Sequence, residues 1–495
     1  MLFSSVEFLC GFLPFTLMVY YLLPGRRLRN RFLLLASLFF YAWGEPLYVL
    51  LMLACIAGNY TFGLLAALFR RQDVKWLEKL GPWPARLNIV LMLAFNLGLL
   101  GVYKYAGFVV SNLNQSFGLQ LEDPGLVLPI GISFFTFQGM SYVLDVFRGQ
   151  AQARRNVLDV GLYVAFFPQL IAGSIVRYNT IAKEIDGRRE NWRDFAAGVD
   201  LFIIGLGKKV LLANNFALIA EKIFDGATYD NPLEMAVAAA WIAAVAYTLQ
   251  IYFDFSGYSD MALGLGRMFG FHFLPNFNYP YVARSVTDFW RRWHMSLSSW
   301  FRDYVYIPLG GNRLGLPRQI VNLFAVWLLT GLWHGANWTF VVWGLYYFCF
   351  LAVEKICREK LPKLAGLLGK IPLLGNLVTM LVVIIGWVIF RSADLSQAVQ
   401  HIGLMFGVYG NPLTDEIFTF QMLENRVQLA VACVACLPLL PLLKRGLHRL
   451  HVVLGRGWVG VPLGVLRDCC LLLMLLLALA ALAKGSYNPF IYFNF

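Results

Sequence analysis

The sequence predicts an all-α polytopic membrane protein, and three observations support this fold class. Of its 495 residues, 59% are hydrophobic and only 14% are charged, whereas the charged fraction of soluble proteins is about a quarter. The mean hydropathy is +0.63. Lysines and arginines gather in short segments between apolar runs, as cytoplasmic loops do. The net charge of +13 therefore indicates membrane topology, and we expect no nucleic-acid partner.

The eight cysteines are spread over apolar runs, which predicts no disulfide framework. Cys433 and Cys436 form a CxxC pattern, but the pair lies inside a predicted membrane helix, where packing cysteines are more common than redox or metal sites. No clustered carboxylates or paired histidines give a convincing metal site either. We therefore expect no metal site.

The N-terminal segment predicts one helix and then a hairpin across the membrane. Val6–Leu23 lacks the basic flank and small-residue cleavage site of a signal peptide, so we interpret it as a retained helix. The basic segment Arg26–Arg31 reads as a cytoplasmic loop, which places the N-terminus outside. Phe32–Trp43 and Pro46–Phe69 form the hairpin, although its first arm is short for a hydrocarbon core of about 30 Å.

The next runs continue this alternation with one exception. Leu87–Val110 is predicted to exit and Val127–Phe147 to return. Val157–Val176 is basic on both sides and contains FFPQLIAGS. Proline and glycine in mid-run, with like-charged flanks, favour a broken or re-entrant segment over a simple crossing.

The run Phe195–Ala220 contains Lys208 and Lys209, for which two interpretations remain open. The lysines extend to the membrane interface, or they act as counter-ions or anion ligands inside the protein. The following run, Met235–Ser256, carries Asp254. This aspartate is a possible partner for a buried lysine.

The C-terminal part predicts three more spans, Leu373–Phe390, Val427–Leu443 and Val461–Leu482. They leave an aromatic tail, residues 484–495, outside. No internal repeat or separate soluble domain is visible. We therefore expect a single membrane-embedded domain over residues 1–495, with its signature and catalytic region at residues 267–338.

Within that region, the stretch Arg284–Trp338 holds two of the six histidines, His294 and His334. His294 follows Arg291, Arg292 and Trp293 at the margin of a basic segment, whereas His334 lies between two apolar runs. Imidazole exchanges a proton near neutral pH, and ionisable groups at membrane depth usually have a function. Both histidines are therefore candidates for catalysis.

The run Ile320–Trp333 spans about 21 Å at about 1.5 Å per residue, which is less than a hydrocarbon core of about 30 Å. His334 should therefore lie part-way through the bilayer. Because Ala336–Val353 leads back to a basic loop, we expect a hairpin with an imidazole at its tip, suited to proton transfer at the floor of a cavity. The alternative is a core histidine bonded to a backbone carbonyl.

Residues 267–318 contain several arginines and no lysine. Arginine suits planar or phosphate-bearing anions. Arg291, Arg292 and Arg302 are therefore our first candidates for binding the anionic groups of a donor. The alternative is that they only anchor the cytoplasmic face.

The segments WRRWHMSLSSWFRDYVYIPLGGN and GLWHGANWTFVVWGLYYF closely resemble the membrane-bound O-acyltransferase family, in particular its bacterial alginate O-acetyltransferase-like branch. The resemblance extends from the opening MLFSSVEFLCGFLPF to the terminal FIYFNF. One departure is Ser174, which stands where the family pattern has proline. The resemblance implies a ring of about 11 to 12 transmembrane helices with re-entrant segments around a central funnel. It also implies that His334 is the catalytic histidine and His294 the second signature position.

The same resemblance implies an activity. An acetyl group would pass from a cytoplasmic thioester donor, acetyl-CoA, towards O-acetylation of an exported polysaccharide such as alginate. A periplasmic acetyltransferase partner would complete the transfer, and the chain would lie in the bacterial inner membrane among membrane lipids. No bound cofactor is implied.

The tail ends in FIYFNF, which holds Tyr492. A tyrosine hydroxyl that a nearby base activates can act as a nucleophile, so Tyr492 is a candidate acyl relay. The alternatives are an aromatic anchor at the interface or a docking element for a partner.

Two other functions remain open at this point. One is a transporter of a polar or lipid-linked substrate with His334 in a proton relay, although the absence of repeated halves argues against it. The other is an enzyme of the same family that acylates a protein or a lipid. Neither a nucleophile elbow, a P-loop nor a zincin motif is present.

Overall fold

The computed structural model describes residues 1–70, 81–170, 173–224, 229, 231–363, 371–439, 460–485 and 487–489. Helices form throughout this part of the chain, and no β-strand occurs in it, which confirms the all-α prediction. Six helices in the described ranges are long and apolar enough to cross a membrane: α3 (Tyr48–Phe69), α5 (Trp83–Phe117), α12 (Val237–Met268), α16 (Trp338–Lys360), α18 (Pro372–Arg391) and Gly464–Ala483 within α23 (Gly460–Ala483). The chain is therefore a multi-pass membrane protein.

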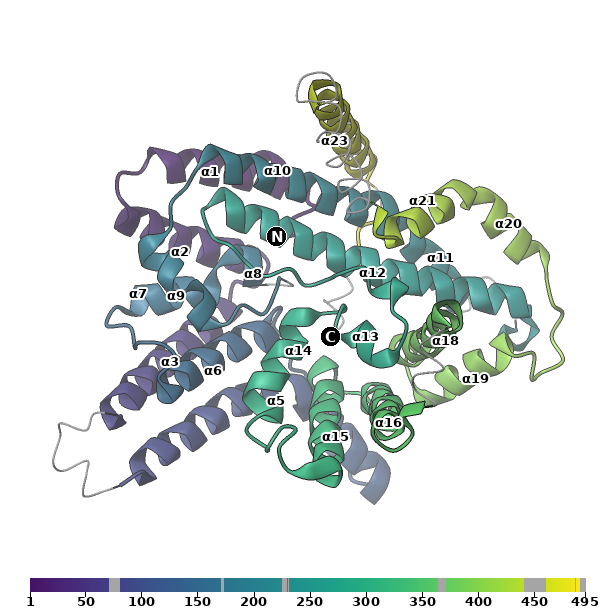
Figure 1. Ribbon diagram of the computed structural model, residues 1–495, viewed down its shortest axis with the longest axis horizontal. Coiled ribbons are helices and arrows are strands. Elements are labelled where there is room, and N and C mark those ends of the chain that lie inside the picture. The colour runs from purple at the N-terminus through teal and green to yellow at the C-terminus, as the bar shows by residue number, and fades with distance from the viewer. Residues whose placement is uncertain are drawn as a thin grey trace. The chain divides into compact units, whose positions relative to one another are not determined.

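The helices gather in two compact units. The first unit comprises Met1–Phe202, Met261–Leu274 and Trp300–Tyr304, and the second comprises Ile203–Asp260, Pro275–Ser299 and Val305–Phe495. The other helices of the first unit (Figure 1) are η1 (Glu7–Phe12), α1 (Leu13–Leu22), α2 (Arg26–Ala42), α6 (Ile132–Arg148), α7 (Val157–Ala165), α8 (Phe167–Leu170), α9 (Tyr178–Gly187) and most of α10 (Trp192–Gly207).

The second unit holds the remaining helices. Besides most of α12 and the spans α16, α18 and α23, they include η2 (Lys208–Ala213), α11 (Asn214–Phe224), α13 (Val286–Trp290), most of α14 (Met295–Phe301), α15 (Gly315–His334), α19 (Leu395–Met405), α20 (Glu416–Glu424) and α21 (Arg426–Cys436). Short 3-10 or π-helical turns complete the chain as η3 (Pro232–Glu234), η4 (Pro280–Val282) and η5 (Arg302–Tyr306).

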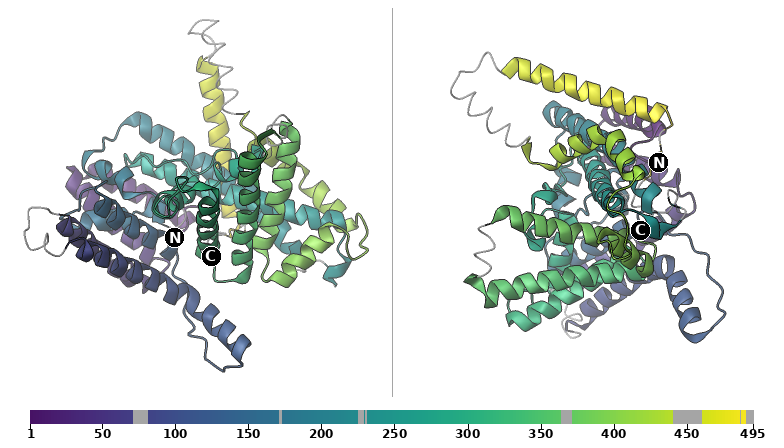
Figure 2. Two further views of the ribbon diagram at one scale, coloured as in Figure 1. Left: turned by 60° about the horizontal axis from the view of Figure 1, so that its bottom comes forward. Right: turned by 90° about the vertical axis from the view of Figure 1, so that its right-hand side faces the viewer.

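In the first unit, α3, α5 and α6 pack side by side (Figures 1 and 2). Asn59 of α3 and Asn96 of α5 exchange two side-chain hydrogen bonds of 2.9 and 3.0 Å. Both side chains are fully buried. Such reciprocal amide bonds join helices where the surroundings offer no water to polar groups.

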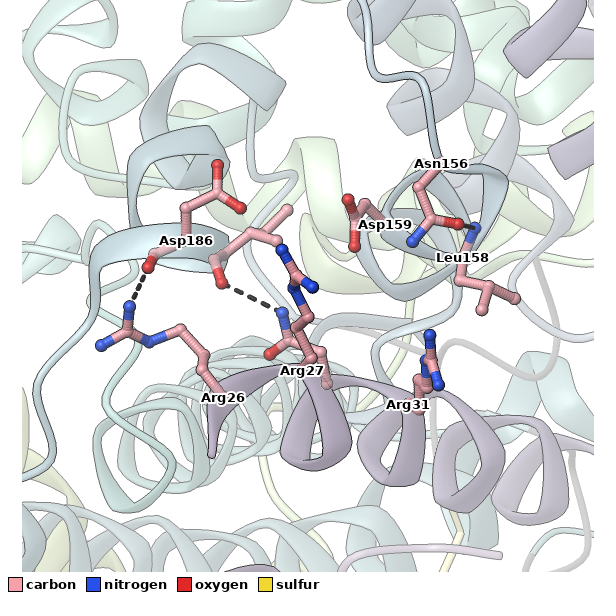
Figure 3. A pocket seen from close by; sticks show the side chains of 9 residues that line it. Arg26, Arg27, Arg31, Asn156, Leu158, Asp159 and Asp186 are labelled. Carbon is pink, nitrogen blue, oxygen red and sulfur yellow. Dashed lines mark hydrogen bonds between the residues drawn. The ribbon is translucent and has the colours of Figure 1, made fainter. Parts of the chain in front are cut away.

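The predicted loop Arg26–Arg31 is wrong, because these residues form the first turns of α2. Gly25 precedes the helix with φ of +74°, and arginine is a good helix former. Arg26 donates to the carbonyl of Asp186 (Figure 3) and to that of Arg188. Asn30 donates to the Ile185 carbonyl at 3.0 Å. The basic turns of α2 are therefore fixed to the end of α9.

These bonds border a cavity of about 590 Å³ in the first unit. Its charged lining includes Arg27, Arg31 and Asp159 (Figure 3). Asp186 faces the same space and forms an ion pair with Arg154. Three of the polar side chains around this cavity, those of Arg26, Asn30 and Asp186, are thus already used to join segments of the first unit.

The segment Val157–Val176, which the sequence predicted to be a broken helix, is interrupted in the structure. α7 ends at Ala165, Phe166 has non-helical backbone angles, and the short helix α8 follows. Pro168 lies in the first turn of α8, where a missing N–H costs no helical bond. Ser174 donates a hydrogen bond of 2.8 Å to the carbonyl of Leu274, so this residue fixes the segment through its hydroxyl group. Re-entry into the membrane stays a prediction.

Two predicted spans end too early. α5 has 35 residues and α12 has 32, because polar side chains near their ends continue the helix instead of starting a loop. Asp260 shows why: it lies inside α12 and forms an ion pair of 2.7 Å with Lys208. A charge that is paired within the protein need not end a helix.

The predicted hairpin around His334 is present as α15 and α16. The two helices touch through glycines: a side-chain carbon at Gly344 would lie 2.5 Å from the Trp327 carbonyl oxygen, and one at Gly331 would lie 2.5 Å from that of Phe340. Small residues let helix backbones approach closely. This contact fixes the position at which α15 ends.

Candidate active site

His334 is the last residue of α15, as the sequence predicted. Its ring is buried, with 6% of the residue exposed. Three aromatic rings meet it edge to face, with centroid distances of 4.9 Å to Trp333, 4.9 Å to Trp343 and 5.1 Å to Phe390. The imidazole therefore lies in an apolar enclosure, where electrostatic effects are stronger than in water.

The turn after His334 is built from small and capping residues. A side-chain carbon at Gly335 would collide with the ring of Phe340, so no larger residue fits there without a shift. Asn337 accepts a hydrogen bond of 3.1 Å from the Thr339 amide and thereby caps α16. Its side-chain nitrogen donates to the Ala393 carbonyl at 2.7 Å. The HGAN sequence thus holds the end of α15 against the end of α18.

His294 lies between α13 and α14 and is also buried, with 1% exposed. Its φ of +44° falls in the left-handed region, which is uncommon for residues other than glycine. Such strain costs about 1–3 kcal/mol and persists where the surroundings impose it. Surrounding contacts, rather than local preference, therefore place the His294 ring.

Asn276 supplies the main contact. Its side-chain oxygen lies 3.1 Å from His294 Nδ1 and accepts bonds of 3.1 and 2.9 Å from the amide and hydroxyl of Ser296. Because that oxygen can only accept, we assign the proton to Nδ1. The Nε2 atom is then a lone-pair acceptor, and it has no hydrogen-bond partner within the described ranges. Burial lowers the pKa of His294 to about 3, so the ring is neutral at physiological pH.

The structure brings the two candidate histidines to the same aromatic ring. The Trp333 centroid lies 4.9 Å from that of His334 and 6.1 Å from that of His294. Phe255 of α12 packs edge-on against the other side of His294 at 4.7 Å. All four residues belong to the second unit.

A carboxylate from α16 fixes the segment that precedes His294. Glu354 accepts hydrogen bonds from the Val286 amide at 2.6 Å, the Thr287 amide at 3.0 Å and the Thr287 hydroxyl at 2.6 Å. These amides begin α13, and a carboxylate at a helix N-terminus is favourable. Glu354 thus joins the hairpin of His334 to the segment of His294.

Aromatic side chains fill the space around this arrangement. Neighbouring rings in the cluster lie at centroid distances of 4.7 Å for Trp290–Trp327, 4.8 Å for Trp293–Trp387 and 5.3 Å for Trp343–Tyr347. Such rings bury large areas and pack rigidly. The site is therefore preorganised by packing.

The three arginines predicted to bind a donor differ in their surroundings. The Arg291 side chain is exposed and makes no hydrogen bond or ion pair with described residues. Arg292 is paired with Asp288 at 2.9 Å. Arg302 is paired with Asp303 at 2.7 Å and belongs to the first unit. Donor binding by these residues stays a prediction.

One buried ion pair settles the two interpretations of Lys209. Its ammonium lies 2.8 Å from Asp254, and the two side chains are 1% and 2% exposed. Lys209 is therefore a buried counter-ion. His401 is by contrast a core histidine: its Nε2 lies 3.2 Å from the Ala240 carbonyl oxygen, and its ring stacks on Phe224 at 4.1 Å.

Sequence reasoning missed Asn276 and Glu354. Asn276 is 18 positions from His294 in an irregular segment, and Glu354 reads as an ordinary residue at the start of a basic loop. Neither has a local sequence signal, because each acts through a contact distant in the chain. Tyr492 and its predicted role lie outside the described residues.

Comparisons with known proteins add a family and several relatives. The model of the membrane-bound O-acyltransferase family (MBOAT) matches residues 37–393. The chain is 39% identical to the probable alginate O-acetylase of Pseudomonas putida, with 100% of both chains covered. It is 33% identical to the peptidoglycan O-acetyltransferase of Helicobacter pylori, covering 100% of this chain and 98% of the relative. A teichoic acid D-alanyltransferase of Bacillus subtilis is 28% identical over 45% of this chain and 58% of its own length.

The left-handed backbone at His294 gives a testable prediction. His294→Gly and His294→Ala both remove the ring, but only glycine adopts this φ without strain. We expect the glycine variant to be the more stable by about 1 kcal/mol, measured by thermal unfolding in detergent. Ser298, exposed in α14, is the matched control, where alanine should be the more stable. If alanine is the more stable substitution at both His294 and Ser298, the backbone at His294 is not strained.

Proposed function

The chain belongs to the membrane-bound O-acyltransferase family and is a multi-pass membrane enzyme, and we propose that it transfers an acetyl group from a thioester donor towards an exported polysaccharide. The observation that carries this proposal is the buried His334 ring at the tip of the α15–α16 hairpin, enclosed by aromatic rings. Family membership favours an enzyme over the transporter that the sequence left open. The names of two relatives, an alginate O-acetylase and a peptidoglycan O-acetyltransferase, support a glycan acceptor.

In the proposed reaction, His334 acts as a general base. The imidazole takes the proton of the acceptor hydroxyl as that oxygen attacks the thioester carbonyl carbon. A new C–O bond forms, the C–S bond breaks, and the leaving thiolate takes up a proton. The C-terminal end of a helix favours positive charge, and His334 stands at that end of α15. The position therefore suits a ring that becomes positively charged during the reaction.

His294 has a supporting role in this proposal. Its ring is neutral and oriented by Asn276, so it can accept a hydrogen bond through Nε2 without carrying a fixed charge. It also packs near Trp333, which contacts His334. We assign His294 to orienting the reacting groups, and His334 to the proton transfer.

The donor is proposed to be acetyl-CoA, which enters from the cytoplasm. Its phosphates require cations, and among the predicted arginines Arg291 has an exposed side chain with no pairing carboxylate in the described ranges. Arginine forms bidentate contacts with phosphate. Arg292 and Arg302 would have to exchange their present carboxylate partners for the donor.

The acetyl group is proposed to leave on the outer side of the inner membrane of a bacterium. There a periplasmic acetyltransferase would accept it, either directly or from an ester on Tyr492, and pass it to the polysaccharide. Alginate fits the name of one relative, while the D-alanyl transfer named for another rests on a partial match. Acetyl and D-alanyl donors assayed side by side separate these two transfers.

His334→Ala should lower polymer acetylation by about 10²–10⁴-fold, the usual range for loss of a general base. Acetylated polymer and the yield of folded, detergent-extracted protein are measured together. His401→Gln is the control, since His401 is a buried histidine of the same unit whose ring is bonded to a carbonyl. Parental acetylation by His334→Ala would rule out the general-base role.

Arg291→Gln should weaken binding of acetyl-CoA and reduce the dependence of that binding on ionic strength, because one cation fewer faces the phosphates. Affinity is measured by titration at several salt concentrations. Arg189, exposed in the first unit, is neutralised as a control. If Arg291→Gln binds like the parent at every salt concentration, its charge serves topology alone.

Tyr492→Phe keeps an aromatic side chain but removes the hydroxyl nucleophile. We expect it to abolish the labelled ester on the chain and to reduce polymer acetylation strongly, because a relay needs that oxygen. Mass spectrometry of the C-terminal peptide after incubation with labelled donor provides the measurement. Acetylation at the parental rate would leave the tail as an anchor or docking element.

A further inference from the structure

The described part of the C-terminal tail, Tyr487–Pro489, contacts η2 and α11 through three hydrogen bonds. The Tyr487 hydroxyl donates to Glu221 at 2.6 Å, and the Asn214 amide nitrogen donates to the side-chain oxygen of Asn488 at 3.3 Å. The Lys209 ammonium donates to the Pro489 carbonyl. Three consecutive tail residues are therefore bound to one stretch of the second unit.

Lys209 makes this contact while it is buried and paired with Asp254 at 2.8 Å. Removing two charges from water costs more than their attraction often returns, so a buried ion pair is weak support for stability. In a membrane protein, buried charges are usually functional. We therefore expect the pair to have a function beyond packing. The contact of Lys209 with the tail indicates that this function is to hold the tail.

The backbone around Lys209 is held closely. Residues Lys208–Ala213 form a π-helical turn, a feature that is frequent at functional sites. A side-chain carbon at Gly257 of α12 would lie 2.7 Å from the Gly205 carbonyl oxygen and 3.1 Å from the Lys209 amide nitrogen. The helix backbones are in direct contact here. This contact fixes the backbone from which the Lys209 side chain extends.

The same part of α12 reaches the candidate active site. Asp254 is followed by Phe255, whose ring packs edge-on against His294 at 4.7 Å. Asp254, which pairs with the tail-binding Lys209, and Phe255, which packs against His294, are thus adjacent residues of α12. A shift of Asp254 would be transmitted to the ring that supports His294.

We infer that Lys209 is a positioning residue: neutralised by Asp254, it binds the Pro489 carbonyl and fixes the tail residues Tyr487–Pro489 against η2 and α11. This inference rests on the proposed function, because it assigns the tail a part in acyl transfer. The neighbouring Lys208–Asp260 pair, with side chains 25% and 23% exposed, makes no hydrogen bond to the described tail residues and provides a matched control.

The test compares Lys209→Met with Lys208→Met in the full-length protein. Hydrogen exchange of the C-terminal peptide reports tail docking without any need for activity. We expect exchange at Tyr487 and Asn488 to rise about tenfold in Lys209→Met, because a charge-assisted bond is lost, and to stay parental in Lys208→Met. We also expect kcat for polymer acetylation to fall with KM for acetyl-CoA unchanged, since the substitution leaves Arg291, the proposed donor contact, in place.

A second variant keeps the test decisive if Lys209→Met fails to fold. Tyr487→Phe combined with Asn488→Leu removes two tail contacts and leaves the buried pair untouched, and it should raise exchange and lower kcat in the same way. Parental exchange in the variants that fold would overturn the inference. Raised exchange with parental kcat would overturn the positioning role. Failure of the proposed function would instead appear as acetylation by His334→Ala, and it would leave the exchange result intact.

Discussion

A polar group buried among membrane helices must be bonded to another part of the protein, because lipid and aromatic side chains offer it no hydrogen bonds. The second unit meets this constraint at several points that surround the candidate histidines. Asn276 binds His294, Glu354 binds the start of α13, and Asp254 binds Lys209. Each bond joins segments that are distant in the chain, so the groups that need partners also determine how the site is assembled.

Close helix packing adds the second requirement. Gly331 and Gly344 let α15 and α16 touch, and Gly335 lets the chain turn against Phe340. The end of α15 then presents His334 to Trp333, Trp343 and Phe390. With rigid aromatic neighbours, the ring is already oriented before a substrate binds, which is the arrangement expected where proton transfer depends on position.

The sequence predicted the features that depend on local pattern. The sequence predicted that the helix before His334 ends at this residue, and α15 does end there. The helix begins earlier than expected, at Gly315, and has 20 residues, so the depth of His334 in the bilayer stays a prediction. Proline and glycine in Val157–Val176 predicted a break, and α7 ends at Ala165. Features that depend on distant contacts could not be predicted in this way. The side chains of Arg26 and Asn30 bind carbonyl groups at the end of α9, a contact that the basic pattern did not predict. Asn276 and the tail contacts of Lys209 likewise have no signal in neighbouring residues.

The central claim is that the His334 ring takes the proton of the acceptor hydroxyl. Its most direct test is the pH dependence of acetyl transfer in a single turnover, measured for the parent and for His334→Gln. For a general base, the parental rate should rise with pH through one titration and then level off, because only the neutral ring accepts a proton. The variant should be slower and should lose that titration. A variant that keeps the same titration at a comparable rate would contradict the claim.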